Sequence, residues 1–276
     1  MAESDARHKH LRDETIKDFG RQWTTYTDNK GYYGSSDLLA DIVEPLLPIG
    51  ELRNATVADI GSGSGRIVQM LIQAGVAKVY AVEPSQAFET LKRNTAENAS
   101  QIVLLNLRGD QLPADLNLDF VLSIGVVHHI PHPEPVLSAA YAALRPGGRV
   151  LLWLYGMEGN EAYLAVFGPL RRVTRQLPHA LLAPLCHAIN LTTELYIAIA
   201  SFVRVPMREY IRNVFGRFDR RTRYLAIYDQ LNPHYAKYHK RDEAIDLLRT
   251  TGFKNVQAHH RHGYSWTVIG TKPGVP

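Results

Sequence analysis

The stretch Val57-Ala-Asp-Ile-Gly-Ser-Gly-Ser-Gly-Arg66 decides the fold of this chain. A short apolar run ends in an acid, and three glycines then alternate before an amphipathic segment. This order is typical of a strand that feeds a glycine-rich turn at a helix N-terminus, where backbone amides bind a small polar ligand. Glu83 ends the next apolar run, about 20 residues further on, where an acid can hydrogen-bond ribose hydroxyls. The ligand is therefore expected to contain a nucleoside.

Length and composition are those of an ordinary globular protein. The 276 residues, 45% of them hydrophobic and 21% charged, suffice for one α/β domain with an insertion or for two small domains. The single cysteine, Cys186, excludes an internal disulfide, and the polar start of the chain does not predict a secretory signal. We therefore expect a cytoplasmic protein. A net charge of +4 permits anionic partners without demanding nucleic acid.

Predicted strands and helices alternate along most of the chain. Apolar residues at helical spacing predict a helix from Ser36 to Pro48, and Ser85 is the expected N-cap of a later helix. We predict strands at 55–60, 77–83, 101–107, 118–125 and 149–155, with helices at 64–75, 85–98 and 133–144 between them. This order predicts a parallel sheet with helices on both faces.

The alternation then stops and later resumes. Residues 157–238 are predicted to be mostly helical, and a helix at 241–251 ends at Gly252 before strands at 254–261 and 264–271. The predicted fold is a Rossmann-like, mostly parallel seven-stranded sheet with an antiparallel final strand and a helical insertion after strand five. The predicted organisation is an N-terminal lid (1–35), a core (36–156), the insertion (157–238) and the completion of the core (239–276).

Four separated motifs resemble those of one enzyme family. They are Gly61-x-Gly63-x-Gly65, the segment Leu107–Pro113, the segment Asp119–Pro131, and Leu144-Arg-Pro-Gly-Gly-Arg149. Together, and in this order, they closely resemble class I S-adenosylmethionine-dependent methyltransferases. The resemblance covers about residues 54–156 and 240–271.

The resemblance implies a cofactor site for S-adenosylmethionine. It places the glycines at the methionine part, Asp59 near its amino group and Glu83 at the ribose. Physical chemistry agrees, because a carboxylate accepts two hydroxyl donors well and only glycine allows the closest backbone approach. Adenine is expected beside Asp110, and the sulfonium beside Gly125. The implied cofactor-binding residues are Asp59, Gly61, Ser62, Gly63, Gly65, Glu83, Pro84, Asp110, Gln111, Gly125 and Val126.

A hydride-transferring enzyme is the alternative for such a glycine turn. A dinucleotide site usually has the spacing Gly-x-Gly-x-x-Gly, which this turn lacks. The run Pro146-Gly147-Gly148 also has no role in such an enzyme. A non-catalytic module that binds the cofactor remains a further alternative.

Nucleic acid is not expected as the acceptor. The loop Gly125-Val-Val-His-His-Ile130 lacks the Asn/Asp-Pro-Pro-aromatic motif of base-nitrogen methylation, and Asn232-Pro-His-Tyr235 resembles that motif only superficially. No cluster of aromatic residues among basic ones is evident in the sequence. His128 and His129 are the catalytic candidates: His129 is either a general base with a pKa near working pH or a wall of the pocket. No metal pattern is found, so no metal is expected.

The insertion contains a long apolar segment, 184–204. His187, Asn190, Glu194 and Ser201 share one helical face, which either lines the substrate pocket or lies in solvent on a lid or dimer helix. Polar residues at its middle argue against a membrane span. Peripheral membrane contact remains open, because arginines flank the segment at 171, 172, 175, 204, 208 and 212.

A second, less specific resemblance suggests the acceptor. The segments Phe19–Tyr26 and Tyr228–Tyr235 look like a branch of these enzymes that acts on sugars and glycan intermediates. We therefore expect O-methylation of a hydroxyl on a small sugar-like or anionic molecule. C- or N-methylation of a lipid-like or natural-product acceptor is the alternative. The expected substrate-binding residues are Tyr26, Tyr32, Tyr33, His187, Glu194, His234, Tyr235, His260 and His262.

Overall fold

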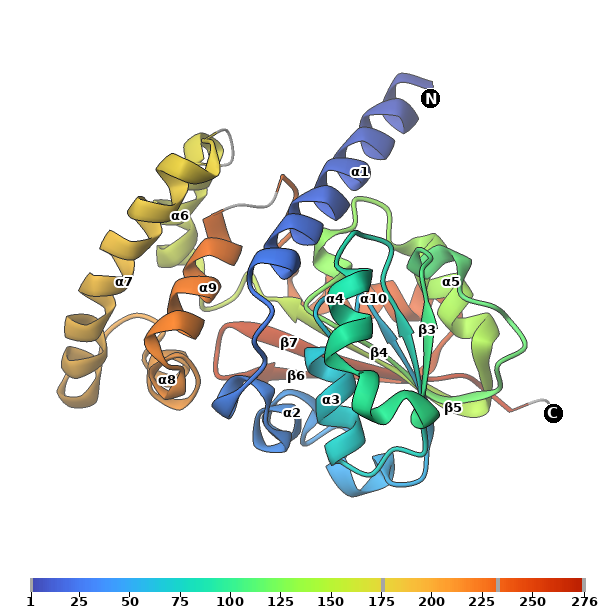
Figure 1. Ribbon diagram of the computed structural model, residues 1–276. Helices are drawn as coiled ribbons and strands as arrows, with labels where there is room; N and C mark the ends of the chain where they lie inside the picture. Colours follow the sequence, from blue (N-terminus) through green and yellow to red (C-terminus); the bar gives the residue numbers. More distant parts are fainter. Residues whose placement is uncertain (1, 175–176, 232–233, 275–276) are drawn as a thin grey trace.

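A seven-stranded sheet forms the centre of the molecule (Figure 1). The computed structural model describes residues 2–174, 177–231 and 234–274. The strands follow the order β3-β2-β1-β4-β5-β7-β6, in which β7 runs antiparallel to both of its neighbours. Their bounds are β1 Thr56–Ile60, β2 Lys78–Val82, β3 Ile102–Leu105, β4 Leu118–Ile124, β5 Leu144–Tyr155, β6 Lys254–Arg261 and β7 Ser265–Thr271. The predicted fold class is confirmed.

Helices cover both faces of the sheet because apolar residues of the central strands are buried on both sides. On one face, α2 (Ser36–Val43), α3 (Arg66–Gln73) and α4 (Phe88–Asn94) pack on Val57, Val79 and Leu122. On the other face, α5 (Glu134–Ala143) and α10 (Arg241–Thr251) pack on Ala58 and Val121. Short 3-10 helices occupy Gly31–Gly34, Ile49–Leu52, Ala96–Gln101, Gly109–Gln111, Val127–His129 and Phe215–Arg217.

The inserted helices form a second layer beside the core. They are α6 (Glu161–Thr174), α7 (His179–Phe202), α8 (Arg208–Asn213) and α9 (Arg220–Leu231), with an apolar cluster of their own. The long α1 (Ala2–Thr25) runs between this layer and the sheet (Figure 1). Gln22 of α1 donates a hydrogen bond to Asp229 of α9 over 3.0 Å, and the Tyr26 hydroxyl donates one to Tyr224 over 3.0 Å.

Several element boundaries differ from the sequence-based prediction; the helix expected from Ser36 to Pro48, for example, ends at Val43. Strand β5 begins at Leu144 and not at residue 149, because its pairing with β4 continues through a bulge at Pro146-Gly147-Gly148. The run Pro146-Gly147-Gly148 is thus part of the strand. Helix α4 begins at Phe88, so Ser85 is not its N-cap; the Ser85 hydroxyl instead accepts from the Ala87 amide over 3.1 Å. The end of α10 at the left-handed Gly252 is as predicted.

Asn160 anchors the start of the insertion to the sheet. Its side chain is buried and its amide nitrogen donates to the carbonyl oxygens of Gly156 (2.8 Å) and Tyr264 (2.6 Å). We expect Asn160→Ala to lower the free energy of unfolding by about 1–3 kcal/mol, because two buried hydrogen bonds are lost and the Tyr264 carbonyl keeps only its bond from the Gly156 amide. Denaturant titration measures this loss. Asn213→Ala, which removes an exposed bond to Glu209, is the matched control and should stay within about 0.5 kcal/mol; equal effects would contradict the anchoring role.

Candidate functional site

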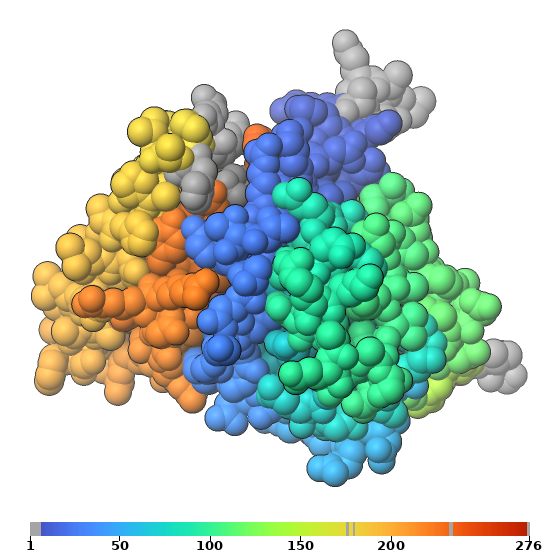
Figure 2. Space-filling view, viewed as in Figure 1, coloured from blue at the N-terminus to red at the C-terminus, as the bar shows by residue number. Residues whose placement is uncertain are grey.

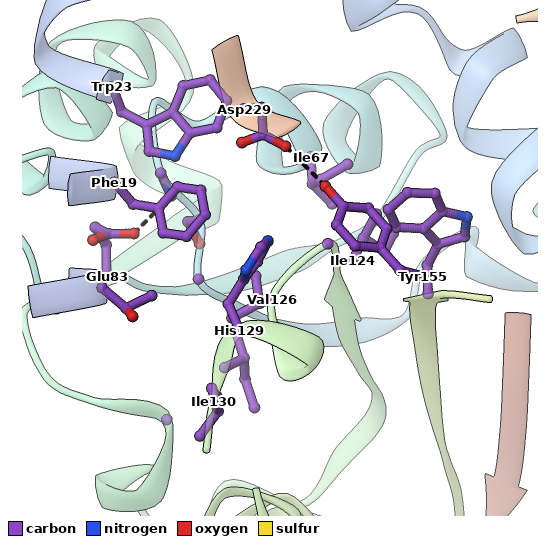
Figure 3. Close-up of a pocket in the computed structure, with 18 of the residues that line it drawn as sticks. Phe19, Trp23, Ile67, Glu83, Ile124, Val126, His129, Ile130, Tyr155 and Asp229 are labelled. Carbon is purple, nitrogen blue, oxygen red and sulfur yellow. Dashed lines mark hydrogen bonds between the residues drawn. The ribbon is translucent and has the colours of Figure 1, made fainter. Parts of the chain in front are cut away.

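A cavity of about 510 Å³ opens at the carboxyl ends of β1, β2 and β4. This edge of a doubly wound sheet is where such folds bind ligands. One face of α1 and part of α9 line the cavity opposite the strand ends. Figure 3 shows Phe19 and Trp23 on one side, Tyr155 and Asp229 on another, and the His129 ring pointing between them. We call this cavity the chamber.

The glycine turn after β1 forms part of the chamber wall. Gly61 has φ +80°, and a Cβ there would lie 2.5 Å from a methyl group of Val126. Gly63 has φ +53°, and a Cβ there would lie 3.1 Å from the Trp23 indole. Both positions therefore require glycine, and both line the chamber. Gly65 serves differently: it is the left-handed N-cap of α3 and does not line the chamber.

Glu83 holds this turn in place. One carboxylate oxygen accepts from the Gly63 amide over 2.8 Å, and the other accepts from the Ser85 amide over 2.9 Å. The side chain is only 5% exposed, yet it lines the chamber together with Pro84. A buried carboxylate with further lone pairs facing the chamber suits two hydroxyl donors of a ribose.

Asp59 is a buried acid directly before the chamber wall. It is 1% exposed, and its Oδ2 has no hydrogen-bond partner among the described residues. Burial raises the pKa of Asp59 to about 7, with Ser62 and Arg66 opposing and Glu83 adding to the shift. A cationic amino group nearby would stabilise this charge, so the orphaned oxygen fits the methionine end of S-adenosylmethionine.

Of the two residues predicted to bind adenine, Asp110 lines the chamber and Gln111 does not. Asp110 lines the chamber, but its two oxygens accept from the Arg108 guanidinium over 2.9 and 3.0 Å. Gln111 does not line the chamber; its side-chain oxygen accepts from the Arg108 amide. Asp110 can therefore bind adenine only with the oxygen lone pairs that the arginine leaves free.

The loop after β4 carries Gly125, Val126 and His129 into the chamber. The His129 Nδ1 lies 2.8 Å from the carbonyl oxygen of Tyr235, which can only accept, so Nδ1 carries the hydrogen. The buried Nε2 has no partner among the described residues. Burial lowers the pKa of His129, with Asp229 opposing, so the ring is neutral near pH 7 with a free lone pair.

His128 belongs to the core and not to the chamber. It is fully buried, stacks on Tyr155 at a ring-centre distance of 3.8 Å and does not line the cavity. Burial lowers the pKa of His128 well below its usual value. A catalytic contact by His128 with the acceptor, as expected from the sequence, is therefore contradicted by its position.

Several chamber residues escaped the sequence analysis. Phe19 and Trp23 reach the chamber from α1, Tyr155 from the end of β5 and Asp229 from α9. The Asp229 carboxylate accepts from the Tyr155 hydroxyl over 2.9 Å, and also from Gln22. Phe19 and Trp23 lie in the segment Phe19–Tyr26, and Asp229 lies in the segment Tyr228–Tyr235; both segments stood out in the sequence, but no local pattern showed that these three side chains reach the chamber.

Most of the predicted acceptor residues lie outside the chamber. Of the three tyrosines only Tyr33 lines it, and the Arg66 guanidinium stacks on that ring. Tyr26 bonds to Tyr224, and Tyr32 lies under the Arg217 guanidinium. These two tyrosines pack the lid segment against the insertion. They do not line the chamber, so they are not placed to bind the substrate there as predicted.

The histidines predicted to bind substrate have partners elsewhere. His234 Nδ1 pairs with Asp18 over 2.5 Å, and the neighbouring Tyr235 contributes its backbone carbonyl to His129. His260 stacks on Trp266, and His262 pairs with Asp41 over 2.8 Å. None of these four residues lines the chamber, so the prediction that they do is wrong. Asn232, in the motif Asn232–Tyr235, lies outside the described residues.

The polar face of α7 borders α9 and does not line the chamber. Glu194 accepts from the Arg220 and Arg223 guanidinium groups over 2.9 and 2.7 Å, and Asn190 donates to the Arg220 carbonyl. His187 stacks on Tyr224 at 4.3 Å, yet His187 and Ser201 are exposed and the Glu194 side chain is 42% exposed. The expectation that His187 and Glu194 line the substrate pocket is therefore corrected, and the alternative of a partly solvent-exposed face agrees with the structure.

The comparison with protein families identifies the class of the core. Residues 58–152 match the family described as methyltransferase domain. This match covers the glycine turn, Glu83 and the His129 loop, which build the chamber wall just described. Residues 58–152 are thus similar to a methyltransferase domain, and the sequence-based predictions of an S-adenosylmethionine-dependent methyltransferase and of its cofactor are confirmed.

Curated relatives resemble part of the chain. A protein of Shewanella oneidensis named tRNA U34 carboxymethyltransferase is 35% identical over 130 residues, which are 46% of this chain and 38% of that protein. The protein of the same name from Klebsiella pneumoniae is 34% identical over 130 residues, 45% of this chain and 39% of that protein. The chain thus spans less than half the length of these relatives.

Solved structures share the fold at low identity. The pyocyanin biosynthetic protein PhzM superposes with a TM-score of 0.53 at 14% identity, over 86% of this chain and 55% of PhzM. Magnesium protoporphyrin IX methyltransferase from Synechocystis PCC 6803 gives 0.50 at 17% identity, over 86% and 83%. These likenesses concern the fold alone.

The comparisons overturn two expectations. Relatives named for tRNA modification contradict O-methylation of a sugar or other small molecule, and with it the expected branch of glycan-acting enzymes. They also contradict the expectation that nucleic acid is no partner. Aromatic and basic residues are not clustered in the sequence, but along one face of α1 at the chamber Lys9 and Arg12 are followed by Phe19 and Trp23 at helical spacing.

The pKa of Asp59 leads to a test of the site in the free protein. Between about pH 4 and pH 7 the unfolded chain releases the Asp59 proton while the folded chain retains it, so this group costs the folded state stability as pH rises. Asp59→Asn cannot ionise. We expect its free energy of unfolding to rise relative to the unmodified protein across this window, by roughly 4 kcal/mol at most, and then to level off. Parallel stability curves from denaturant titrations at pH 4–8 would contradict the raised pKa.

Proposed function

We propose that this chain is a methyltransferase that modifies a nucleotide of tRNA with S-adenosylmethionine as the donor. The observation that supports an RNA acceptor is that a single face of α1 lines the chamber. Lys9 and Arg12 lie toward its outer end, and Phe19 and Trp23 follow at helical spacing. Cations beside aromatic rings suit an RNA strand, because phosphates pair with the cations and a base stacks on the rings.

The donor side of this proposal rests on the glycine turn, Glu83 and Asp59. Backbone amides at Gly61 and Gly63 face the chamber where nothing larger than glycine fits. Glu83 would hold the ribose hydroxyls, and Asp59 would lie near the amino group. When bound, S-adenosylmethionine supplies an electrophilic methyl group; the chain supplies binding, orientation and exclusion of water.

On the acceptor side, His129 and Asp229 offer two proton-accepting groups. The His129 Nε2 is neutral, buried and unpartnered among the described residues, which suits it to take a proton from the acceptor atom. The Asp229 carboxylate is held by Gln22 of α1 and Tyr155 of β5, so it can orient an N–H or O–H group of the base. Relatives named tRNA U34 carboxymethyltransferase support a tRNA acceptor.

The acceptor is tested with radiolabelled S-adenosylmethionine and total tRNA. We expect label in nuclease-sensitive material, in one nucleoside identified by mass spectrometry, which also distinguishes a methyl from a carboxymethyl group. Reversing the charge of Lys9 and Arg12 together should raise the KM for tRNA by about tenfold or more and leave the donor Kd unchanged, because phosphate contacts are lost.

Lys92→Glu is the matched control for this charge change. Lys92 is exposed on α4 and does not line the chamber, so its reversal should leave the KM for tRNA within about twofold. Label that enters only protein, sugar or lipid fractions would overturn the tRNA acceptor. So would a loss of tRNA methylation that is equal in the two variants.

His129 is tested separately from the binding residues. We expect His129→Ala to lower kcat by about 10²–10⁴-fold without changing the donor Kd, as for loss of a general base. Because burial lowers the pKa of His129, the rate of the unmodified enzyme should fall only as pH drops below the range of an ordinary histidine. Steady-state kinetics from pH 5 to 8 measure both effects. Near-normal turnover would show that His129 only shapes the wall; His10→Ala, exposed and outside the chamber lining, is the control.

A further inference from the structure

Exposed apolar side chains are concentrated on one edge of the molecule. Among the described residues, the exposed large apolar side chains all belong to α6, α7 and the residue after α7. They are Val166, Val173, Leu181, Leu191, Leu195, Ile199, Phe202 and Val203. The atoms of α7 form the outer left edge of the space-filling view, on the far side of the insertion from the sheet (Figure 2). Contiguous apolar surface of this kind marks an interaction site.

The exposed residues of α7 form one stripe along the helix. Leu181, Leu191, Leu195 and Phe202 recur at intervals that keep them on one side, and they are 57–89% exposed. We call these four residues the outer stripe. Small apolar side chains, Pro184 and Ala188, are also exposed between the first two. The stripe therefore continues over most of the length of the helix.

The opposite side of α7 is fixed to the protein. Leu182, Cys186 and Ala200 are buried in the cluster that α9 shares. Glu194 pairs with Arg220 and Arg223 on that side. The segment Ala180–Phe202 is long and apolar enough to cross a membrane, but an ionic and packed inner side fits a helix that lies on a surface.

Positive charge lies at both ends of the outer stripe. Arg172 is exposed near the end of α6, and Arg204 and Arg212 are exposed beyond the end of α7. Glu209, also exposed on α8, lies 3.7 Å from Arg208 and offsets the charge of that arginine, which leaves Arg204 and Arg212 in excess. Within the described part of 177–203 the acidic residue is Glu194, which faces α9. The partner of this surface must accordingly combine an apolar layer with negative charge.

We propose that α7 docks the protein on the surface of an anionic lipid bilayer. The outer stripe would enter the boundary between headgroups and acyl chains, and the arginines at its ends would pair with lipid phosphates. A second copy of the chain fits less well. Antiparallel pairing of two α7 helices would bring Arg172 of one copy close to Arg204 and Arg212 of the other. Parallel pairing would bring the same arginines of the two copies together, so like charges would repel in both arrangements.

An RNA strand fits this surface less well than a bilayer does. It would need cations along its path, whereas leucine and phenylalanine fill the stripe between the arginine ends. The docking surface is separate from the chamber, since no residue among those described on α7 lines the chamber. The proposal therefore stands independently of the tRNA acceptor.

Vesicle co-sedimentation tests the proposal with the full-length protein. Vesicles of phosphatidylcholine alone are compared with vesicles of equal parts phosphatidylcholine and phosphatidylglycerol. We expect binding to the second kind, and a loss of about tenfold or more in Leu195→Glu/Phe202→Glu. Arg204→Glu/Arg212→Glu should lose the preference for the anionic vesicles, and more salt should weaken it in the unmodified protein.

Controls separate docking from misfolding and self-association. Arg249→Glu places a charge reversal on α10, away from the insertion, and should bind vesicles like the unmodified protein. Thermal unfolding and S-adenosylmethionine binding should be unchanged in all these variants, because each altered side chain is exposed and outside the chamber. No binding to anionic vesicles would overturn the proposal, as would binding that survives Leu195→Glu/Phe202→Glu. A dimer that these changes dissociate, without vesicle binding, would assign the stripe to a second copy.

Discussion

The buried carboxylate of Glu83 is the constraint on which the donor site depends. It accepts hydrogen bonds from the amides of Gly63 and Ser85, so it joins the turns after β1 and β2. Hydrogen bonds to a buried charge contribute about 1.5–3 kcal/mol each, enough to fix a turn whose glycines have positive φ. The same carboxylate faces the chamber. One side chain thus both shapes the site and offers acceptors to a ligand.

Helix α9 plays the corresponding part for the acceptor half of the chamber. Asp229 and Gln230 line the chamber from α9, while Arg220 and Arg223 of the same helix bind Glu194 of α7. Hydrogen bonds from α1 and β5 to Asp229 connect this helix to the lid and the sheet. The insertion thus builds the acceptor wall on one side and carries its exposed apolar stripe on the other.

The sequence predicted the core well because its signals there are local. Apolar runs, the glycine turn and Gly252 each specify a nearby backbone conformation, and the strands from β1 to β7 appear close to their expected positions. Strand pairing set the start of β5, which the prediction missed. Leu144 belongs to β5 because β4 offers it a partner at Leu118, which no local pattern announces.

The acceptor half was predicted poorly because it depends on contacts between distant segments. His187 and Glu194 share a polar face as expected, but the arginines of α9 turn that face away from the chamber. Asp229 reaches the chamber only because α9 packs beside α1. Helical spacing from Lys9 to Trp23 was readable, yet without the fold nothing showed that this face covers the glycine turn.

Calorimetric titration tests whether the chamber binds S-adenosylmethionine through the Glu83 carboxylate. The unmodified protein should bind S-adenosylmethionine in preference to NAD. Glu83→Gln should weaken the binding of S-adenosylmethionine by about tenfold or more, because a charged hydrogen-bond acceptor is lost. A tenfold change corresponds to about 1.4 kcal/mol. Preference for NAD, or an affinity for S-adenosylmethionine that Glu83→Gln leaves unchanged, would contradict the account.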